Sequence, residues 1–334
     1  YRHPGSDTST SSDPEQPQTR KPQTQPPHSS SDCEVPSVDY RSGRAAETLE
    51  EHVQRNIPLR IVGIPQDALP ELRDSLLREV SGHRAVRLRA LGVRGSVRKF
   101  AEEVNTTLRE ALRDGGSLAS THYAAQLSVP DNLPELLPMT PRPALDLTSV
   151  WTKQAGRAVP ASPYLYYFGG DSAGSASEAQ NFQGESHEQR RERGPALYMH
   201  YDAAENFVQV IDGWKEFSLY DPFQASQVLY GSNVEYGNAS PVDPQSPNVS
   251  KEYPLFRFAH RRRCIVHRGE MLYVPIFWWH WVRSGGERIV SLAHFHEGDQ
   301  DKKGFFQKIM CGYQLKPAAF ECGKFKGRHP RSSA

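Results

Sequence analysis

Residues 264–280 read CIVHRGEMLYVPIFWWH, and this stretch decides which fold the chain can adopt. Two short apolar runs, 264–267 and 271–274, lie on either side of a turn at Gly269 and are rich in β-branched and aromatic residues. Pro275 then bends the chain before His280, which is set among tryptophans. Runs of about four residues suit strands rather than helices, which need about ten or more. The stretch therefore predicts two short strands that lead to a histidine.

The same pattern of short strands continues on both sides of this stretch. Strands separated by turns rather than by helices predict an antiparallel sandwich or barrel, so the expected fold class is mainly β. Asp212-Gly213 lies between two of the runs and predicts a hairpin, because both positions must accept positive φ. The expected strands are 164–168, 198–210, 216–220, 264–267, 271–274 and 288–295.

The composition changes along the chain. Residues 1–45 hold seven prolines and only six hydrophobic residues, which predicts a disordered tail. Residues 46–160 are predicted to be a helical or mixed part of the main domain, with helices at 45–56 and 96–111 and a strand at 59–63. Residues 161–300 are expected to form the β core, and residues 301–334 a C-terminal helix and a basic tail.

Two long polar insertions interrupt the β core. Residues 171–196 contain one large apolar residue and far exceed the usual hairpin loop of about two to five residues. Loops of this kind are lids, binding loops or disordered segments without a function, and we expect this one to be mobile. Residues 222–256 contain leucine and tyrosine residues and are expected to pack on the core.

Composition and charge exclude several classes of protein. The 40 Lys and Arg residues against 39 Asp and Glu residues give a formal charge of +1, which argues against a dedicated DNA-binding chain. No apolar run approaches the roughly 18 residues of a membrane helix, so no membrane partner is expected. Four cysteines are too few for a disulfide scaffold in a chain of this length, and the absence of a CxxC pair argues against structural zinc. A cytoplasmic or nuclear location is favoured over the secretory pathway.

Three residues form a candidate metal site. His200 and Asp202 lie two positions apart in a predicted strand, so both side chains project from one face. His280 supplies a third ligand. Two imidazoles and one carboxylate with open positions form the facial triad of non-haem Fe(II) oxygenases. A single histidine is more often a core or surface residue, so the prediction depends on both motifs together.

With these motifs the chain resembles the JmjC, or cupin-like, 2-oxoglutarate oxygenases, and most closely their small, factor-inhibiting-HIF-like hydroxylase branch. The resemblance covers about residues 45–300 and implies a double-stranded β-helix, or jelly roll, preceded by helices. The motifs that carry it are His200-x-Asp202, Asn206, Gly213-Trp214-Lys215 and Pro275-x-x-Trp278-Trp279-His280.

The resemblance also implies the cofactors. Fe(II) is expected on His200, Asp202 and His280, with 2-oxoglutarate as cosubstrate and molecular oxygen at the remaining positions. Lys215 is expected to pair with the distal carboxylate of 2-oxoglutarate, because an ammonium is a compact point charge, and Asn206 to line the same pocket. A solvated lysine in a hairpin is the alternative for Lys215.

Other positions carry open alternatives. In the family, a tyrosine before the barrel helps the lysine to hold the carboxylate; Tyr123 falls at that place, and Tyr164 and Tyr166 compete with it. Leu197 stands where many relatives have Thr or Ser, and Ala293 where many have Asn. Ser291 and His294 are candidates to compensate for the missing amide.

The resemblance implies an Fe(II)- and 2-oxoglutarate-dependent dioxygenase that acts as a hydroxylase on a macromolecule, with protein favoured over RNA. A catalytically silent cupin-like binding protein and a lysine demethylase are the alternatives. Residues 305–313 have helical spacing. Relatives dimerise through helices that follow the barrel, so a homodimer through the C-terminal helix is one expectation, and packing of that helix on its own barrel is the slightly favoured alternative.

Overall fold

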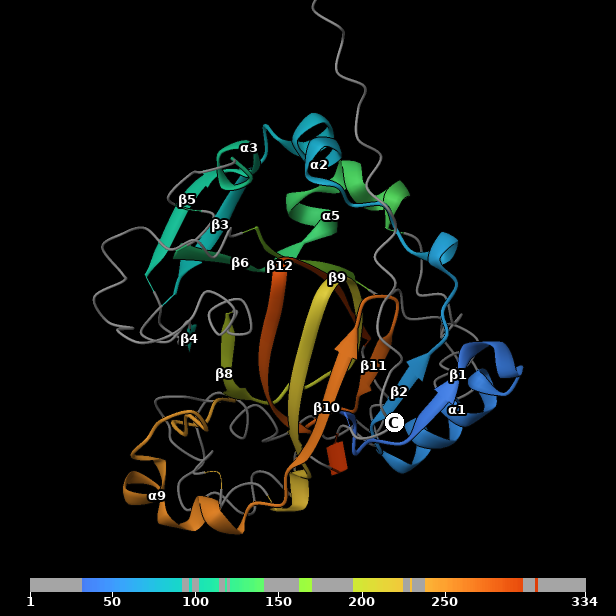
Figure 1. Ribbon diagram of the computed structural model, residues 1–334, viewed down its shortest axis with the longest axis vertical. Helices are drawn as coiled ribbons and strands as arrows, with labels where there is room; N and C mark the ends of the chain where they lie inside the picture. The colour runs from blue at the N-terminus through green and yellow to red at the C-terminus, as the bar shows by residue number, and fades with distance from the viewer. Residues whose placement is uncertain are drawn as a thin grey trace, which may run out of the picture. The chain divides into compact units, whose positions relative to one another are not determined.

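The computed structural model describes residues 32–91, 96–97, 102–113, 118, 121–140, 162–169, 195–224, 229, 238–296 and 304–305. This part of the chain is mainly β, as the sequence predicts, and its strands form a barrel of the jelly-roll kind (Figure 1). No helix among these residues is long and apolar enough to cross a membrane.

The strands share one hydrogen-bonded network. They are β1 (Ser37–Asp39), β2 (Leu59–Val62), β3 (Ala85–Ala90), β4 (Ser96–Val97), β5 (Glu103–Thr107), β6 (His122–Ser128), β7 (Ser162–Phe168), β8 (Ala196–His200), β9 (Glu205–Tyr220), β10 (Arg262–His267), β11 (Met271–Val274) and β12 (Trp279–His296). The helices are α1 (Ala45–Arg55), α2 (Asp74–Ser81), α3 (Leu108–Ala111), α5 (Val129–Asn132) and α9 (Val249–Glu252). The 3-10 turns are η2 (Tyr40–Ser42), η3 (Gln66–Ala68), η5 (Pro134–Met139), η7 (Pro222–Gln224) and η8 (Pro254–Phe258).

Two long antiparallel strands, β9 and β12, run side by side through the middle of the barrel (Figure 1). The first half of β9 also pairs with β11, and its second half pairs with β10. In the same way, β12 pairs with β8 near its start and with β7 near its end. Each long strand thus passes from one layer of the jelly roll into the other.

The predicted hairpin at Asp212-Gly213 is wrong. The two halves of β9 do not pair with each other; the dipeptide is a bend inside one strand, opposite a register shift between Gly285 and Val290 of β12. Gly213 has φ +73, so the positive-φ signal in the sequence is real. A bulge uses the same backbone conformation as a tight turn, and local sequence does not distinguish the two.

This bend changes which residues of β9 face the barrel interior. Before the bend, even-numbered residues such as Val208 and Val210 belong to the interior core, whereas after it Phe217 and Leu219 do. Alternate residues of a strand face opposite sides, so a bend that inserts one residue reverses the pattern. Lys215 therefore points inward together with the residues of the first half.

Ion pairs hold the bend against the elements around it. Arg288 of β12 donates to Asp212 over 2.9 Å and to Asp74 of α2 over 2.7 Å, and it also contacts the carbonyl of Leu72. Arg288 thus connects the bend in β9 both to the partner strand β12 and to helix α2.

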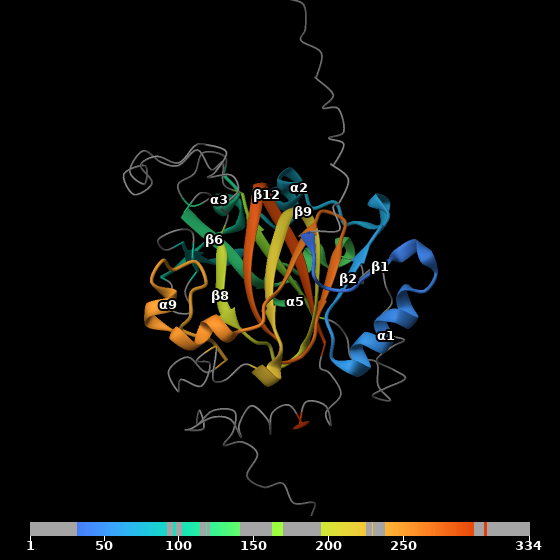
Figure 2. The same cartoon turned by 60° about the horizontal axis from the view of Figure 1, so that its bottom comes forward.

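The remaining apolar clusters lie on the outer faces of the barrel. Helices α2, α3 and α5 cover one outer face through Leu77, Leu108 and Val129. Helix α1 covers another, because Leu49 and Val53, four residues apart on its buried side, pack against β9 and β11 (Figure 2). Part of the second insertion packs on a third face, where Leu229 is fully buried against aromatic side chains.

Two further predictions are corrected. Residues 32–44, which the sequence assigns to a disordered tail, form β1 and η2; Val35 enters the interior core and Cys33 makes a disulfide with Cys264. The helix expected over 96–111 is wrong for the residues that the structure describes there: 96–97 are β4, 103–107 are β5, and of these residues Leu108–Ala111 alone are helical. Val104, Thr106 and Thr107 are β-branched and favour a strand, and Thr107 caps α3 by accepting from the Glu110 N–H. Insertion residues 171–194 and C-terminal residues 306–334 lie outside the described residues.

We predict that Gly213→Ala destabilises the fold far more than Gly43→Ala does. Both glycines have similar φ values, +73 and +71, so each alanine incurs a backbone cost of about 1 kcal/mol. At Gly213 the new Cβ would also lie 2.7 Å from the carbonyl oxygens of Gly285 and Arg288, whereas nothing lies within 4 Å at Gly43. Urea titration should give a loss of about 3 kcal/mol for Gly213→Ala. Equal losses in the two variants would mean that the strands are not this close at the bend.

Candidate metal centre

His200 and His280 are brought together by strand pairing. His200 ends β8, His280 is the second residue of β12, and the two are direct cross-strand partners. Opposite residues in an antiparallel pair share one face, and here the ring centroids lie 4.3 Å apart. Both histidines are buried at the inner side of the barrel.

Asp202 joins the two histidines from just beyond the end of β8. Its carboxylate oxygen lies 3.5 Å from Nε2 of His280, and ligand atoms of the three residues all lie within 4.8 Å of one another. The Asp202 carbonyl accepts a 2.9 Å hydrogen bond from the N–H of Phe277. Phe277 has φ +65, an uncommon conformation for a bulky residue. That bond ties the carboxylate loop to the turn that precedes His280.

Backbone carbonyls set the tautomer of both histidines. Nδ1 of His200 lies 2.7 Å from the carbonyl of Tyr198, and Nδ1 of His280 lies 2.9 Å from that of Trp278. A carbonyl only accepts, so each Nδ1 carries the proton and donates it. In the neutral imidazoles this leaves the Nε2 lone pairs free to bind a metal. Burial lowers the pKa of His280 to about 4, so that ring is neutral at pH 7.

Sequence reasoning missed a buried carboxylate that shapes the turn before His280. Glu205 is fully buried at the start of β9 and accepts from the Tyr273 hydroxyl over 2.7 Å and from the Ile276 N–H over 2.9 Å. From the other side, Trp278 donates its indole N–H to the carbonyl of Asn56, over 2.8 Å. The sequence carries no local signal for Glu205, because both partners are about 70 residues away.

Asn206 contacts the metal-site carboxylate. Its side-chain N–H lies 3.5 Å from the Asp202 carboxylate, and its own carbonyl oxygen is buried with no hydrogen-bond partner among the described residues. An orphaned buried acceptor of this kind is uncommon in proteins. It is consistent with a polar group, such as a ligand or water, that belongs next to Asp202.

Lys215 lies deep in the barrel without a carboxylate partner among the described residues. Its ammonium is 3.1 Å from the Tyr123 hydroxyl and 3.3 Å from that of Ser284, and the face of Tyr166 lies 5.0 Å away. Burial alone lowers the pKa of Lys215 to about 7. A buried amine in these surroundings can bind an anion, because a bound carboxylate would supply the missing partner.

The structure discriminates between the candidate tyrosines. The Tyr123 hydroxyl contacts Lys215, Tyr166 presents only its ring to the amine, and Tyr164 packs edge-on against Phe295. Ser284, which sequence reasoning missed, reaches Lys215 because the two are cross-strand partners in β12 and β9.

Positions 197 and 293, where the chain differs from the family pattern, make apolar contacts instead of polar ones. Leu197 and Ala293 both pack on the interior core. Ser291 shares the inner face of β12 with Ala293, and its hydroxyl is buried without a partner in the part of the chain that the structure describes, whereas His294 faces the opposite side. Of the two residues considered as substitutes for an asparagine at position 293, only Ser291 can contact the interior.

The donors present fit a divalent metal of the iron type together with an anionic cosubstrate. Two neutral imidazoles and one carboxylate converge, and a buried cation lies elsewhere in the same interior. The described residues contain no other cluster of three or more His, Cys, Asp or Glu residues that could hold a metal ion.

A family profile described as "Cupin-like domain" matches residues 179–302, which contain His200, Asp202, Lys215 and His280. The matched segment is thus similar to cupin-like domains of the JmjC type. Tyr123, which contacts Lys215 of this segment, lies outside the matched residues.

Curated relatives match short segments of the chain. Lysine-specific demethylase 8 of Xenopus tropicalis is 31% identical over 91 residues, which are 27% of this chain and 20% of that protein. tRNA wybutosine-synthesizing protein 5 of Mus musculus is 40% identical over 93 residues, 27% of each chain. JmjC domain-containing protein D of Dictyostelium discoideum is 34% identical over 93 residues, 28% of this chain and 20% of that protein. The chain thus spans about a quarter or less of these relatives' length.

We predict that alanine at His200, Asp202 or His280 lowers the affinity for Fe(II), or for Co(II) as a stable substitute, by more than about 100-fold. Loss of a group that merely supports a ligand already costs about 10- to 100-fold. Titration monitored by the absorption of bound Co(II) measures the affinity, and the exposed His83→Ala serves as control. Unchanged affinity in any of the three variants would remove that residue from the ligand set.

We also predict that 2-oxoglutarate binding at pH 8 takes up about 0.9 proton, because an amine with a pKa of about 7 is mostly neutral there and a carboxylate partner raises that pKa. At pH 6, where the free amine is already charged, uptake should nearly vanish. Calorimetry in buffers of different ionisation enthalpy measures this number. Lys215→Met should abolish the pH-dependent part, and uptake that persists in this variant would assign it to another group.

Proposed function

We propose that the chain is an Fe(II)- and 2-oxoglutarate-dependent oxygenase that hydroxylates a protein substrate. The observation that carries the proposal is the combination of a convergent His200–Asp202–His280 set with a buried Lys215 that has no carboxylate partner among the described residues. The triad alone would also suit a non-redox metal cupin. A buried amine in the same interior specifies an anionic cosubstrate.

When bound, iron supplies O2 activation, which couples the oxidative decarboxylation of 2-oxoglutarate to succinate and CO2 with insertion of one oxygen atom into a substrate C–H bond. His200, Asp202 and His280 would hold the metal. Lys215 would bind the distal carboxylate of the cosubstrate, with Tyr123 and Ser284 fixing the direction of its N–H groups. Asn206 would orient Asp202.

Lysine demethylation is the second candidate, because two of the similar proteins bear the name lysine-specific demethylase. Demethylation and hydroxylation begin with the same oxygen insertion and differ in the product that results. Oxygen inserted into a carbon–hydrogen bond of an N-methyl group gives an unstable hemiaminal that releases formaldehyde, whereas a hydroxylated carbon elsewhere keeps the oxygen. The name of a third relative refers to tRNA, so RNA is tested beside protein.

The test of the proposed function is turnover of the cosubstrate. Purified protein with Fe(II), 2-oxoglutarate and isotopically labelled O2 is expected to form succinate that contains one labelled oxygen atom. Lys215→Met should lower 2-oxoglutarate affinity by about 3 kcal/mol or more, the cost of breaking one side of a buried ion pair, while Fe(II) affinity stays within about twofold.

The outcomes distinguish the alternatives. Tight binding of 2-oxoglutarate without any succinate would indicate a silent binding protein. Release of formaldehyde from methyl-lysine peptides, but no stable oxygen gain on any protein or RNA, would favour the demethylase. No binding of 2-oxoglutarate at any metal concentration would reject the oxygenase altogether.

A further inference from the structure

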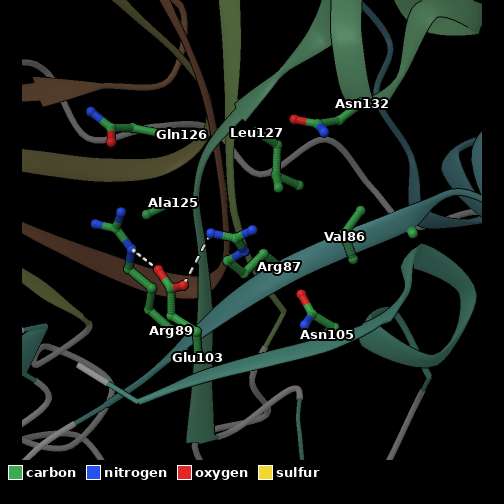
Figure 3. Close-up of a pocket in the computed structure, with 10 residues that line it drawn as sticks. Val86, Arg87, Arg89, Glu103, Asn105, Ala125, Gln126, Leu127 and Asn132 are labelled. Carbon is green, nitrogen blue, oxygen red and sulfur yellow. Dashed lines mark hydrogen bonds and ion pairs between the residues drawn. The ribbon is translucent and has the colours of Figure 1, made fainter. Parts of the chain in front are cut away.

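A polar pocket lies beside the barrel, outside the residues that match the cupin-like domain. It is a cavity of about 420 Å³ between β3, β5 and β6 (Figure 3). This volume lies within the range of about 300–1,000 Å³ that small-ligand sites occupy. Arg87 and Arg89 of β3 converge there on a single carboxylate, that of Glu103 in β5 (Figure 3).

The register of β3 and β6 places the residues that line this pocket on the same face as residues of the barrel interior. Arg89 is the direct cross-strand partner of Tyr123, the residue that contacts Lys215. Cross-strand partners share a face, and residues two apart on one strand do as well, so Arg87 and Arg89 lie on the same face as Tyr123. Ala125, which lines the pocket, also belongs to the interior core.

Two polar contacts connect the pocket to the two ends of the candidate site. Arg89 is a hydrogen-bond partner of the Tyr198 side chain, whose ring centroid lies 5.0 Å from that of His200. Gln126 is a hydrogen-bond partner of Tyr166, whose ring covers Lys215. The pocket therefore adjoins both the metal end and the cosubstrate end of the barrel interior.

Gln126 reaches this position through a strained bulge. It has φ +57, and the pairing of β6 with β7 shifts register between Ala124 and Leu127. Bulges next to active sites re-aim side chains, and a non-glycine residue at positive φ costs about 1 kcal/mol or more. The bulge leaves the Gln126 side chain exposed at the pocket wall, although every flanking residue from 123 to 128 is buried.

We propose that this pocket binds an acidic side chain, Asp or Glu, of the polypeptide substrate, next to the residue that is oxidised. The proposal rests on the proposed function. Two guanidinium groups against one carboxylate leave an excess positive charge, and the planar guanidinium donors match a carboxylate. Amide side chains of Gln126 and Asn105 line the same space and can bind the peptide backbone.

The lining favours a peptide over RNA. No aromatic side chain lines this cavity in the described part of the chain, whereas recognition of unpaired RNA bases relies on stacking against aromatic rings or guanidinium planes.

The test uses the full-length protein with Mn(II) and an unreactive 2-oxoglutarate mimic. The probe is a library of short synthetic peptides in which Asp, Glu, Ala or Lys is fixed at each position in turn. Wild-type protein is expected to select Asp or Glu at one position. Arg87→Gln should reduce the preference for acid over alanine there by about fivefold, an effect suited to a largely exposed guanidinium.

A second variant makes the test independent of simple loss of folding. Glu103→Gln removes the carboxylate that competes for both arginines, so acidic selection at the same position should rise by about threefold or more. Arg55→Gln is the matched control, because Arg55 is an exposed arginine that pairs with one glutamate on α1, on the far side of the barrel from β5 (Figure 1). This control should leave the selection for acidic residues unchanged.

Each outcome has one meaning for the pocket. No acidic selection by the wild type, or equal selection in all variants, would overturn the proposal. Arg87-dependent binding of short RNA oligonucleotides without acidic-peptide selection would also overturn it. Succinate formation in the absence of peptide, measured on the same preparations, tests the oxygenase itself, so failure of the pocket and failure of the proposed function remain distinct.

Discussion

The bend shared by β9 and β12 is the constraint on which the candidate site depends. In a regular strand Asn206 and Lys215, nine residues apart, would face opposite sides of the sheet. The bulge at Asp212-Gly213 reverses the alternation, and the register shift after Gly285 does the same for His280 and Ser284 relative to Ser291. Metal ligands, lysine and interior core can therefore share one enclosed space. Arg288 maintains this arrangement by joining Asp212 to α2.

Inside that space, electrostatics and packing oppose each other. Burial disfavours the charged form of Lys215, and the hydroxyls of Tyr123 and Ser284 only partly replace water. Without an anion the folded chain thus binds fewer protons at this residue than the unfolded chain between about pH 7 and 10.5, and its stability rises with pH across that window. A bound carboxylate reverses the balance, because it favours the charged amine. The free-energy cost of burying the Lys215 amine is therefore smaller when a carboxylate is bound than when none is, as expected of a binding site.

The parts of this molecule that could be predicted from sequence are those with local signals. The short strands and α1 follow from hydrophobic spacing, and the triad, Lys215 and Tyr123 were proposed from motifs whose members the structure brings together. The hairpin at Asp212-Gly213 failed because a bulge and a turn use the same backbone conformation. Glu205 and Ser284 could not be proposed, since their roles arise from partners 68 or more residues away in sequence.

The candidate metal site and the polar pocket come from different parts of the chain, so similarity to relatives in one part leaves the substrate open. The candidate metal ligands and Lys215 lie within residues 179–302, the segment that matches the cupin-like domain. Tyr123 and the polar pocket come from strands β3, β5 and β6, which precede it. The two parts meet at the Lys215–Tyr123 contact and at the pairing of β6 with β7. Because the β3–β5–β6 layer lies outside residues 179–302, it can differ between proteins that share the candidate ligand set, and similarity over that segment therefore does not identify a substrate.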